Sequence, residues 1–419
     1  VLWLHKRDAI SLFCHFPLPL FLVFQFYYTT DACAPAPSTM DVDMWKLPYY
    51  HGLLPREDVV ELLPNDGDFL VRMTEEISGT ERVYALSVNV GGLLNHVIFR
   101  RHKGMFTVDL NSDKGFRTIE RFVDNYLRTG VSVTTQQYVA LIRAVPRAHW
   151  ELSHTSIILG NELGRGTFGS VKSGVYVDQQ GTRAAVAIKE VSQTSTKEQI
   201  KEFMNEARVM RQLRHPNVIQ FYGVAVGQEP LMIVMELATD GSLTNYLKQQ
   251  RRSARVKLYM CLGAAGGLDH IHSKGIIHCD VAARNCLYTD GVVKISDFGM
   301  ATKALSKQIE RGAKLPVKWM SPDALRDRSF TQKSDTWAFG VLCWEVFNNG
   351  ETPFAQLSGS EVAAAVTNGY RLEFPHDAPP KFVEFVMQHI WDPKRNNRYS
   401  MGAVYDWLKR QAEGSQPQN

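Results

Sequence analysis

The sequence predicts an α+β protein in two parts, the second of which has two lobes. In residues 45–143, segments of helical periodicity lie before and after a group of short strand-like runs, and this order of helix, sheet and helix is typical of a small α+β domain. A connector at 144–155 leads into residues 156–411, where a strand-rich stretch up to about Glu236 gives way to a longer helix-rich one. Such a change of pattern predicts two lobes of different composition.

The composition is that of a globular protein. The chain has 419 residues, of which 44% are apolar and 21% charged, and this length allows two or three domains. The formal net charge is +4, and the basic residues are interleaved with acidic ones, so no nucleic-acid partner is indicated. The 6 cysteines include no C-x-x-C pair, so we expect reduced thiols and a cytoplasmic protein.

Residues 1–44 form a leader of different character. A basic start, an apolar run at 10–29 and a small-residue exit are the layout of a signal peptide or a single membrane span. The basic residues before the run would place everything that follows outside the cytosol. We therefore expect a gene-model extension, with the true start at Met40 or Met44, and a membrane anchor is the alternative. The polar tail at 412–419 is expected to be disordered.

An arginine ends an apolar strand in the first domain. The segment GDFLVRMT at 67–74 places Arg72 where a guanidinium would be costly to bury without an anionic partner. That partner could be a ligand, or Arg72 could cap the strand or pair with Glu75 or Glu76 nearby. The motif by itself leaves these possibilities open.

The surrounding segments resemble an SH2 domain, a central antiparallel sheet flanked by two helices, over the whole of residues 45–143. YYHGLLPREDVVELL supplies an arginine on the first helix, and LNHVIF supplies a histidine on a later strand. The resemblance implies a phosphotyrosine-binding pocket, because a planar fork of donors matches phosphate oxygens. Its implied members are Arg56, Arg72, Thr74 and His96. The two carboxylates that follow Thr74 would weaken binding if they pointed inward.

A glycine-rich turn opens the second part. LGRGTFGSV places Gly164, Gly166 and Gly169 between two strand-like runs, where backbone N–H groups can approach phosphates, although this pattern is often just a hairpin. It is followed by VAIK, in which Lys189 ends an apolar strand and therefore needs an anionic partner. Glu206 on the next helical segment can pair with Lys189. Glu202, one turn earlier, is the rival.

Two acidic loops follow in the helix-rich stretch. HCDVAARN contains Asp280 and Asn285, and SDFG contains Asp297. With the glycine turn and VAIK, these segments resemble a protein kinase domain over residues 156–411. The resemblance implies that Asp280 accepts the proton of the substrate hydroxyl and that Asn285 and Asp297 hold Mg²⁺, which prefers oxygen ligands. The implied catalytic group is Lys189, Glu206, Asp280 and Arg284.

The same resemblance implies which residues surround ATP. They are Leu163, Gly164, Arg165, Gly166, Thr167, Phe168, Gly169, Ser170, Val171, Ala187, Lys189, Met235, Glu236, Ala238 and Leu287.

The substrate hydroxyl is predicted to be that of tyrosine. Kinases that act on Ser or Thr usually place a Lys two residues after the catalytic Asp, whereas here Ala282 holds that position and Arg284 follows, as in the AARN of tyrosine kinases. Pro316 and Trp319 in LPVKWMSP resemble the shelf that lets a longer phenol reach the base. The domain order and the connector are similar to the Fes/Fer group of non-receptor tyrosine kinases, without a segment resembling the F-BAR region of full-length relatives.

We therefore expect a non-receptor protein tyrosine kinase that uses ATP and Mg²⁺. Its SH2 domain would recruit it to tyrosine-phosphorylated proteins, and its substrates would be proteins with tyrosine. The alternative is a pseudokinase that acts as a phosphotyrosine-binding adaptor. No nucleic-acid partner is expected, and any recruitment to the inner face of the plasma membrane would be indirect.

Two positions depart from the kinase pattern. Cys279 stands where kinases usually have the Arg that pairs with an activation-loop phosphate, and the loop from DFG to SPD contains no tyrosine. We predict that this loop needs no phosphorylation, the alternative being an incidental substitution. Asp323 stands where a Glu usually pairs with the equivalent of Arg398, and the missing methylene is expected to loosen the helix-rich lobe.

Overall fold

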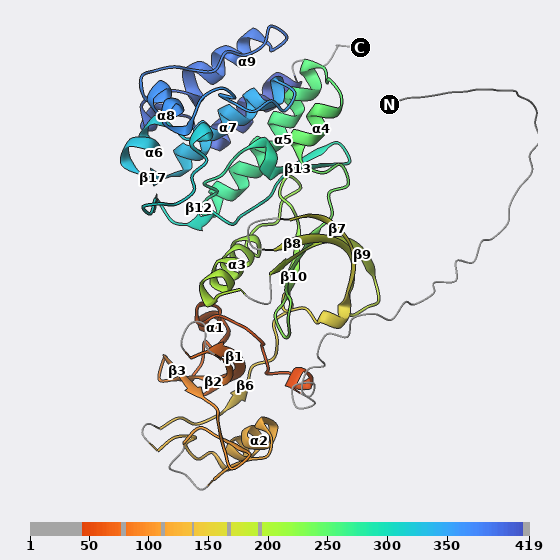
Figure 1. Cartoon of the computed structure of the whole chain (residues 1–419), viewed down its shortest axis with the longest axis vertical. Helices are drawn as coiled ribbons and strands as arrows, with labels where there is room; N and C mark the ends of the chain where they lie inside the picture. The colour runs from red at the N-terminus through yellow and green to blue at the C-terminus, as the bar shows by residue number, and fades with distance from the viewer. Residues whose placement is uncertain are drawn as a thin grey trace, which may run out of the picture. The chain divides into compact units, whose positions relative to one another are not determined.

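The computed structural model describes residues 44–76, 81–109, 114–135, 138–165, 169–191 and 195–413 (Figure 1). These residues belong to one compact unit. The expectations for the leader and for residues 414–419 lie outside the described residues. Within the described ranges no helix is both long and apolar enough to span a bilayer.

The N-terminal module places a sheet between two helices. The strand order is β3-β2-β1-β6, with β1 antiparallel to β2 and parallel to β6. Its elements are α1 (Arg56–Leu62), β1 (Asp68–Glu75), β2 (Arg82–Val90), β3 (Leu93–Ile98), β4 (Arg100–His102), β5 (Met105–Thr107), α2 (Ile119–Thr129) and β6 (Arg143–Ala144). The predicted order of helix, sheet and helix is confirmed.

Strand β1 is buried on both faces, which explains its nearly continuous apolar sequence. Phe69 and Val71 belong to the same buried cluster as Phe122 of α2. Leu70, on the opposite face, packs in the cluster that contains Val59 of α1. Because side chains alternate along a strand, one run of residues serves both helices.

Helix α1 also packs against the second part of the chain. Val59 and Leu63 share one buried cluster with Ile200 and Phe203 of α3 (Lys197–Met210). Beside this apolar contact, the Arg208 guanidinium donates to both carboxylate oxygens of Asp58, at 3.0 and 2.8 Å. Two further ion pairs link the same helices, Lys201 with Glu57 and Arg211 with Glu61.

The connector is anchored at both ends rather than loose. Glu151 accepts from His51 Nδ1 at 2.9 Å, and His51 Nε2 lies 3.0 Å from the Val145 carbonyl oxygen. Leu152 N donates to Val224 O at 2.7 Å, so the connector runs beside an edge of the next sheet.

Residues 157–236 form the N-lobe, a twisted antiparallel sheet with α3 beside it. The strand order is β10-β11-β9-β8-β7. The strands are β7 (Ile157–Arg165), β8 (Ser170–Val177), β9 (Arg183–Val191), β10 (Phe221–Ala225) and β11 (Leu231–Glu236). Helix α3 begins at a capping box, in which Thr196 accepts from Gln199 N and the Gln199 side chain accepts from Thr196 N.

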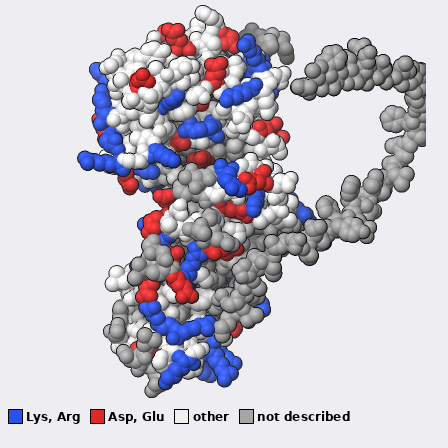
Figure 2. All heavy atoms as spheres, in the orientation of Figure 1, with Lys and Arg blue, Asp and Glu red and all other residues white. Residues whose placement is uncertain are grey.

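The C-lobe is mostly helical, which confirms the predicted second lobe. Its helices are α4 (Leu243–Gln249), α5 (Ala254–Ser273), α6 (Pro322–Asp327), α7 (Gln332–Phe347), α8 (Gly359–Thr367), α9 (Pro380–Phe385) and α10 (Met401–Glu413). Its short strands are β12 (Ile276–Ile277), β13 (Cys286–Thr289), β14 (Val292–Ile295), β15 (Thr302–Lys303), β16 (Lys307–Gln308) and β17 (Ser329–Phe330). Helix α10 continues two residues past the expected boundary at Gln411. Acidic and basic side chains are interspersed over the visible face of this lobe (Figure 2).

Helix α7 is the centre of the C-lobe, since every residue from Ser334 to Phe347 is buried. A helix that is apolar on all sides must be surrounded by other elements. The acidic residues that it carries, Asp335 and Glu345, are therefore buried and need hydrogen-bond donors from neighbouring segments.

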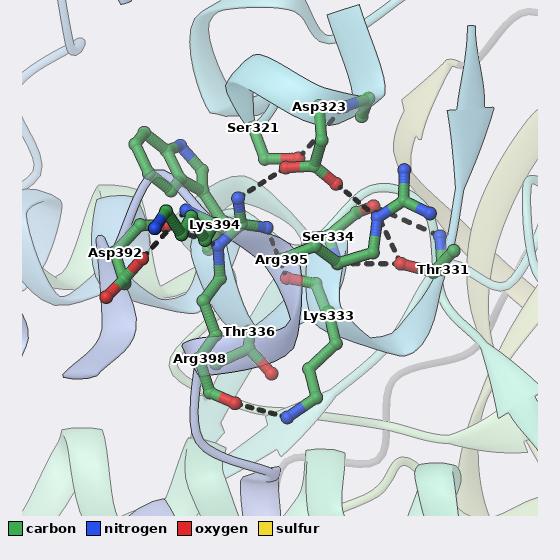
Figure 3. A network of polar contacts seen from close by, with 12 residues as sticks. Ser321, Asp323, Thr331, Lys333, Ser334, Thr336, Asp392, Lys394, Arg395 and Arg398 are labelled. Carbon is green, nitrogen blue, oxygen red and sulfur yellow. Dashed lines mark hydrogen bonds and ion pairs between the residues drawn. The ribbon is translucent and has the colours of Figure 1, made fainter. Parts of the chain in front are cut away.

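The shorter carboxylate at position 323 still reaches its partner (Figure 3). Asp323 pairs with the fully buried guanidinium of Arg398 and accepts from Arg395 Nε at 2.8 Å. Arg398 also donates to the backbone oxygens of Asp392, at 2.9 Å, and Lys333, at 3.0 Å. The missing methylene therefore does not break the contact with Arg398, and Arg395 adds a second contact to the same carboxylate.

We predict that Asp323→Asn lowers the free energy of unfolding by about 3–5 kcal/mol, the cost of leaving a buried charge without its partner. Burial acts to raise the pKa of Asp323, but the contacts with Arg398 and Arg395 outweigh it and the pKa is lowered. The stabilisation is thus present above the ordinary carboxyl range and disappears as the pH falls through the lowered pKa. Urea denaturation of both proteins at several pH values measures this.

The matched control is Asp327→Asn, because Asp327 is half exposed and its ion pair is with Arg395 at the surface. That change should cost less than about 1 kcal/mol. Equal losses for the two variants would contradict a special role for the buried pair.

Candidate active site

A single loop between β12 and β13 brings together the predicted base and one predicted metal ligand. Asn285 Nδ2 donates to the Asp280 carboxylate at 2.7 Å and to the Asp280 backbone oxygen at 2.8 Å. The Arg284 guanidinium pairs with the other carboxylate oxygen of Asp280. The carboxylate of Asp280 is therefore held in one orientation by two side chains of its own loop.

Buried acids of α7 fix the backbone of this loop. Asp335, 1% exposed, accepts from the backbone N–H groups of His278, at 2.7 Å, and Cys279, at 2.9 Å. Glu345 accepts from Ala283 N and from the indole of Trp319, both at 2.9 Å. Burial raises the pKa of Glu345 to about 7.

Glu345 is a positioning residue that the sequence analysis missed. It connects the loop of Asp280 to Trp319, whose ring lies under the Arg284 guanidinium at 4.1 Å. The available signal was a glutamate within residues 337–347, a run that is otherwise apolar, since a buried carboxylate needs hydrogen-bond donors.

Lys189 and Glu206 form the predicted ion pair across two elements. Lys189 Nζ on β9 lies 2.6 Å from Glu206 Oε2 on α3. Glu206 is 4% exposed, whereas the rival Glu202 is exposed on the outer face of the helix. Burial raises the pKa of Glu206 and the Lys189 ammonium opposes that shift, while the Asp297 carboxylate adds to it. Asp297 is thus close enough to this pair to influence it.

The residues expected around ATP lie on the facing strands of the N-lobe and on β13. Gly164 is opposite Val171, and Arg165 is opposite Ser170, at the ends of β7 and β8. Ala187 of β9 is opposite Met235 of β11. Leu163 is part of β7, Glu236 ends β11 and is followed by Ala238, and Leu287 lies on β13. Gly166, Thr167 and Phe168 lie outside the described residues.

Gly169 is required by the close approach of two strands. A Cβ atom at this position would lie 1.9 Å from the Glu190 backbone oxygen. Only glycine allows the residue before β8 to lie so near β9, the strand on which Lys189 is opposite Val171.

A second group of predicted residues lies in the N-terminal module, around a cavity of about 160 Å³ lined in part by Arg56, Arg72 and Thr74. Arg72 is 2% exposed, and its Nε donates to Ser87 Oγ at 3.1 Å while its Nη1 donates to Leu54 O at 3.2 Å. Its Nη2 is buried and has no hydrogen-bond partner among the described residues.

The acidic alternatives for Arg72 are excluded by their own ion pairs. The Glu75 carboxylate lies 3.6 Å from Arg82, and Glu76 accepts from Arg100 at 2.6 Å. Burial and the neighbouring Arg56 charge lower the pKa of Arg72 to about 10. The Glu57 carboxylate acts in the opposite direction, but among the described residues Arg72 forms no salt bridge.

His96 reaches this site through a serine. Its Nδ1 lies 2.9 Å from Ser87 Oγ, which accepts from Arg72. Burial and the charges of Arg72 and Arg56 lower the pKa of His96 to about 4, so its ring is neutral at neutral pH.

Comparison with known proteins places the chain in a family. Residues 157–408 match the family described as protein tyrosine and serine/threonine kinase. The chain is 37% identical over 371 residues to the tyrosine-protein kinase transforming protein Fps of avian sarcoma virus (strain PRCII), covering 86% of this chain and 67% of that protein. It is 34% identical over 376 residues to Fer-related kinase 1 of Caenorhabditis elegans, covering 88% of this chain and 94% of that protein. The chain belongs to the Fes/Fer group of protein tyrosine kinases.

Two further matches concern the length of a relative and the N-terminal module. Human tyrosine-protein kinase Fer is 34% identical over 361 residues, and the chain spans 42% of its length. Residues 45–129 match a domain of unknown function (DUF7063).

In this Fes/Fer-group kinase, the activation loop is held by backbone pairing. β15 pairs with β12, and β16 pairs with β17. Ile309 N donates to Arg328 O at 2.8 Å, and the Arg328 guanidinium donates to Glu310 O at 3.0 Å. Lys303, also in the loop, donates to Gln212 at 2.9 Å, just beyond the end of α3.

Cys279 contributes apolar packing at the position where kinases usually have an arginine. It is 3% exposed and lies in a buried cluster with Ile277, Met320, Ala324 and Phe330. Burial raises the pKa of its thiol, which is therefore neutral at neutral pH. The loop is thus attached at this point by apolar contact and not by a charge that would need a phosphate.

We predict that phosphatase treatment of the purified chain leaves its rate of tyrosine phosphorylation unchanged, because no contact described for the loop requires a phosphate. The measurement compares initial rates before and after treatment. A Fes/Fer kinase with a tyrosine in this loop serves as the positive control. A large loss of activity that preincubation with ATP restores would contradict the prediction.

Proposed function

We propose that this kinase transfers the γ-phosphate of ATP to tyrosine residues of proteins, with Asp280 as the base. The observation that carries the proposal is the closed ion pair of Lys189 and Glu206, at 2.6 Å, in a chain whose Asp280 and Asn285 are hydrogen-bonded to each other. In kinases this ion pair must be in place for transfer.

The residues fit ATP and Mg²⁺. Asn285 and Asp297 would hold the metal, because an amide oxygen and a carboxylate are ligands that Mg²⁺ prefers. The two carboxylates of Asp297 and Glu206 lie near a single ammonium group, that of Lys189. A bound cation would balance the excess negative charge. The bound metal would neutralise charge on the transferring phosphoryl group. Lys189 would hold the α- and β-phosphates, while the strand ends from Leu163 to Val171, with Met235 and Leu287, would enclose the nucleotide.

Asp280 would accept the proton of the phenol as the substrate attacks. Its orientation is fixed by Asn285 and Arg284, so the carboxylate does not have to reorganise during the reaction. Trp319 is held by Glu345, and its ring lies against the Arg284 guanidinium that pairs with Asp280. An aromatic ring near the base suits the ring of a tyrosine better than a serine side chain.

We also propose that the N-terminal module is an SH2 domain that binds phosphotyrosine. The buried Arg72 with an unpartnered Nη2, beside Arg56 and Thr74, supports an anionic ligand. His96, neutral and linked through Ser87, would lie beside the ring. The partners would be tyrosine-phosphorylated proteins in the cytoplasm, and any membrane association would come through them. The free, buried thiols of Cys261, Cys279, Cys286 and Cys343 are consistent with a reducing compartment.

The competing function is that of a pseudokinase adaptor. Pseudokinases typically lack the lysine, the base or a metal ligand, and this chain retains Lys189, Asp280, Asn285 and Asp297.

We predict that Asp280→Asn lowers turnover on a poly-Glu-Tyr substrate by about 10²- to 10⁴-fold, the usual contribution of a positioned base. Steady-state rates at saturating Mg-ATP measure the effect. Asp290→Asn is the matched control, since Asp290 is exposed in a turn at φ 51°, a conformation that Asn tolerates. A wild-type chain with no transfer, where a control kinase works, would favour the adaptor.

We predict that Arg72→Leu weakens phosphotyrosine-peptide binding by about 2–5 kcal/mol, because the phosphate loses a buried charged partner. Arg72→Lys keeps the charge without the planar fork, so its affinity should lie between those of the wild type and Arg72→Leu. Calorimetric titration measures the affinities, with the exposed Arg121→Leu as control. An unchanged affinity for Arg72→Leu would rule out this pocket.

A further inference from the structure

The cavity at Arg72 is not built by the N-terminal module alone. Three of the residues that line it, Lys197, Ile200 and Lys201, belong to the first turns of α3, the N-lobe helix that carries Glu206. Ile200 is buried in the cluster that α3 shares with α1, so this part of the helix has a fixed place beside the cavity.

Both lysine ammonium groups are already bonded to residues that line the same cavity. Lys197 Nζ donates to the Glu75 backbone oxygen at 3.3 Å. Lys201 Nζ lies 2.6 Å from Glu57 Oε1, and 63% of the Lys201 side chain is exposed. Both lysine side chains line the cavity, and their present partners line it as well. Because a lysine side chain is long and flexible, each ammonium group can turn from its present partner to an anion at Arg72.

The acidic groups that line the cavity are in ion pairs, whereas in the described part of the chain Arg72 has an Nη2 without a hydrogen-bond partner. The carboxylates that line it are Glu57 and Glu75, and each has a basic partner, Lys201 and Arg82 respectively. Arg72 has an unpartnered buried Nη2, and Arg56 adds a second guanidinium. The start of α3 contributes the positive end of the helix as well. Glu198 is the acidic residue of that first turn.

We propose that Lys197 and Lys201 are phosphate-binding residues of the phosphotyrosine pocket, so that the pocket is a joint site of the N-terminal module and the N-lobe. This inference rests on the proposed function of Arg72. A phosphate monoester carries between one and two negative charges and three acceptor oxygens. Arg72 and Arg56 engage one side of it, and the two ammonium groups of α3 engage the side that faces the kinase. A bound phosphate thereby contacts the helix that positions Glu206.

The competing interpretation is that the lysines only join the two domains. Lys201 pairs with Glu57 of α1, so removing Lys201 also removes an interdomain ion pair. Glu57→Gln breaks the same ion pair but keeps the lysine and takes a carboxylate away from the cavity. The two interpretations therefore predict opposite effects for Glu57→Gln.

The experiment titrates the full chain with phenyl phosphate at low salt and follows binding by calorimetry. We expect the double variant Lys197→Met, Lys201→Met to bind roughly threefold to tenfold more weakly, in the range for partly exposed charge pairs. Its affinity should also depend less on salt concentration, because two charges are lost. Glu57→Gln should bind phenyl phosphate as tightly as the wild type or more tightly. Lys274→Met, an exposed lysine of the C-lobe, controls for the loss of positive charge.

The outcomes separate this inference from the function on which it rests. Wild-type binding that Arg72→Leu abolishes, together with an unchanged affinity in the double Met variant, would overturn the role of the lysines and leave the phosphotyrosine pocket in place. Equal losses for Glu57→Gln and for the double Met variant would assign the lysines to the interdomain contact and overturn the inference. Absence of Arg72-dependent binding in the wild type would overturn the pocket and the inference together.

Discussion

The ion pair of Lys189 and Glu206 depends on the position of α3, and α3 is held from two sides. On one side the helix packs beside the sheet of the N-lobe, where Glu206 meets Lys189 at 2.6 Å. On the other side its apolar residues share a core with α1, and Arg208 grips Asp58 with two hydrogen bonds. A helix that is anchored in this way resists the outward shift that would open the ion pair, because apolar burial and paired charges would be lost together. The N-terminal module is in this sense part of the structure that holds the active site.

Buried acids serve as fixed points elsewhere in the chain. Asp335 and Glu345 lie on a helix without a solvent-exposed side, yet each accepts two hydrogen bonds from the segments that carry chemistry. A buried carboxylate is tolerated only where donors converge on it, so each acid selects one arrangement of the loop around it. Asp323 is likewise a buried carboxylate with converging donors, since it accepts hydrogen bonds from the guanidinium groups of Arg395 and Arg398.

The activation loop shows how apolar contact can replace a charge. A guanidinium at position 279 would need an anion, and a loop phosphate is the usual one. A thiol needs none, and Cys279 packs among Ile277, Met320 and Phe330 instead. Backbone pairing of β15 and β16 with their neighbours then supplies the remaining order. The chain thus has neither an arginine at position 279 nor a tyrosine in the loop from Asp297 to Asp323.

The sequence by itself determined the order of elements and the identity of the chemical groups, because periodicity and motif spacing are local properties. Arg72 and Lys189 were predicted to need anionic partners because each ends an apolar strand, whereas the roles of Asp280, Asn285 and Asp297 were predicted from the resemblance to protein kinases. Tertiary structure decided which groups meet. Glu206 and Glu202 lie on one helix, and only the packing of α3 buries the first and exposes the second. Glu345 contacts Ala283, 62 residues away in the sequence, and Lys197 of α3 contacts Glu75 at the Arg72 cavity, 122 residues away. Contacts of that kind follow from how buried surfaces fit together, and no spacing in the sequence specifies them.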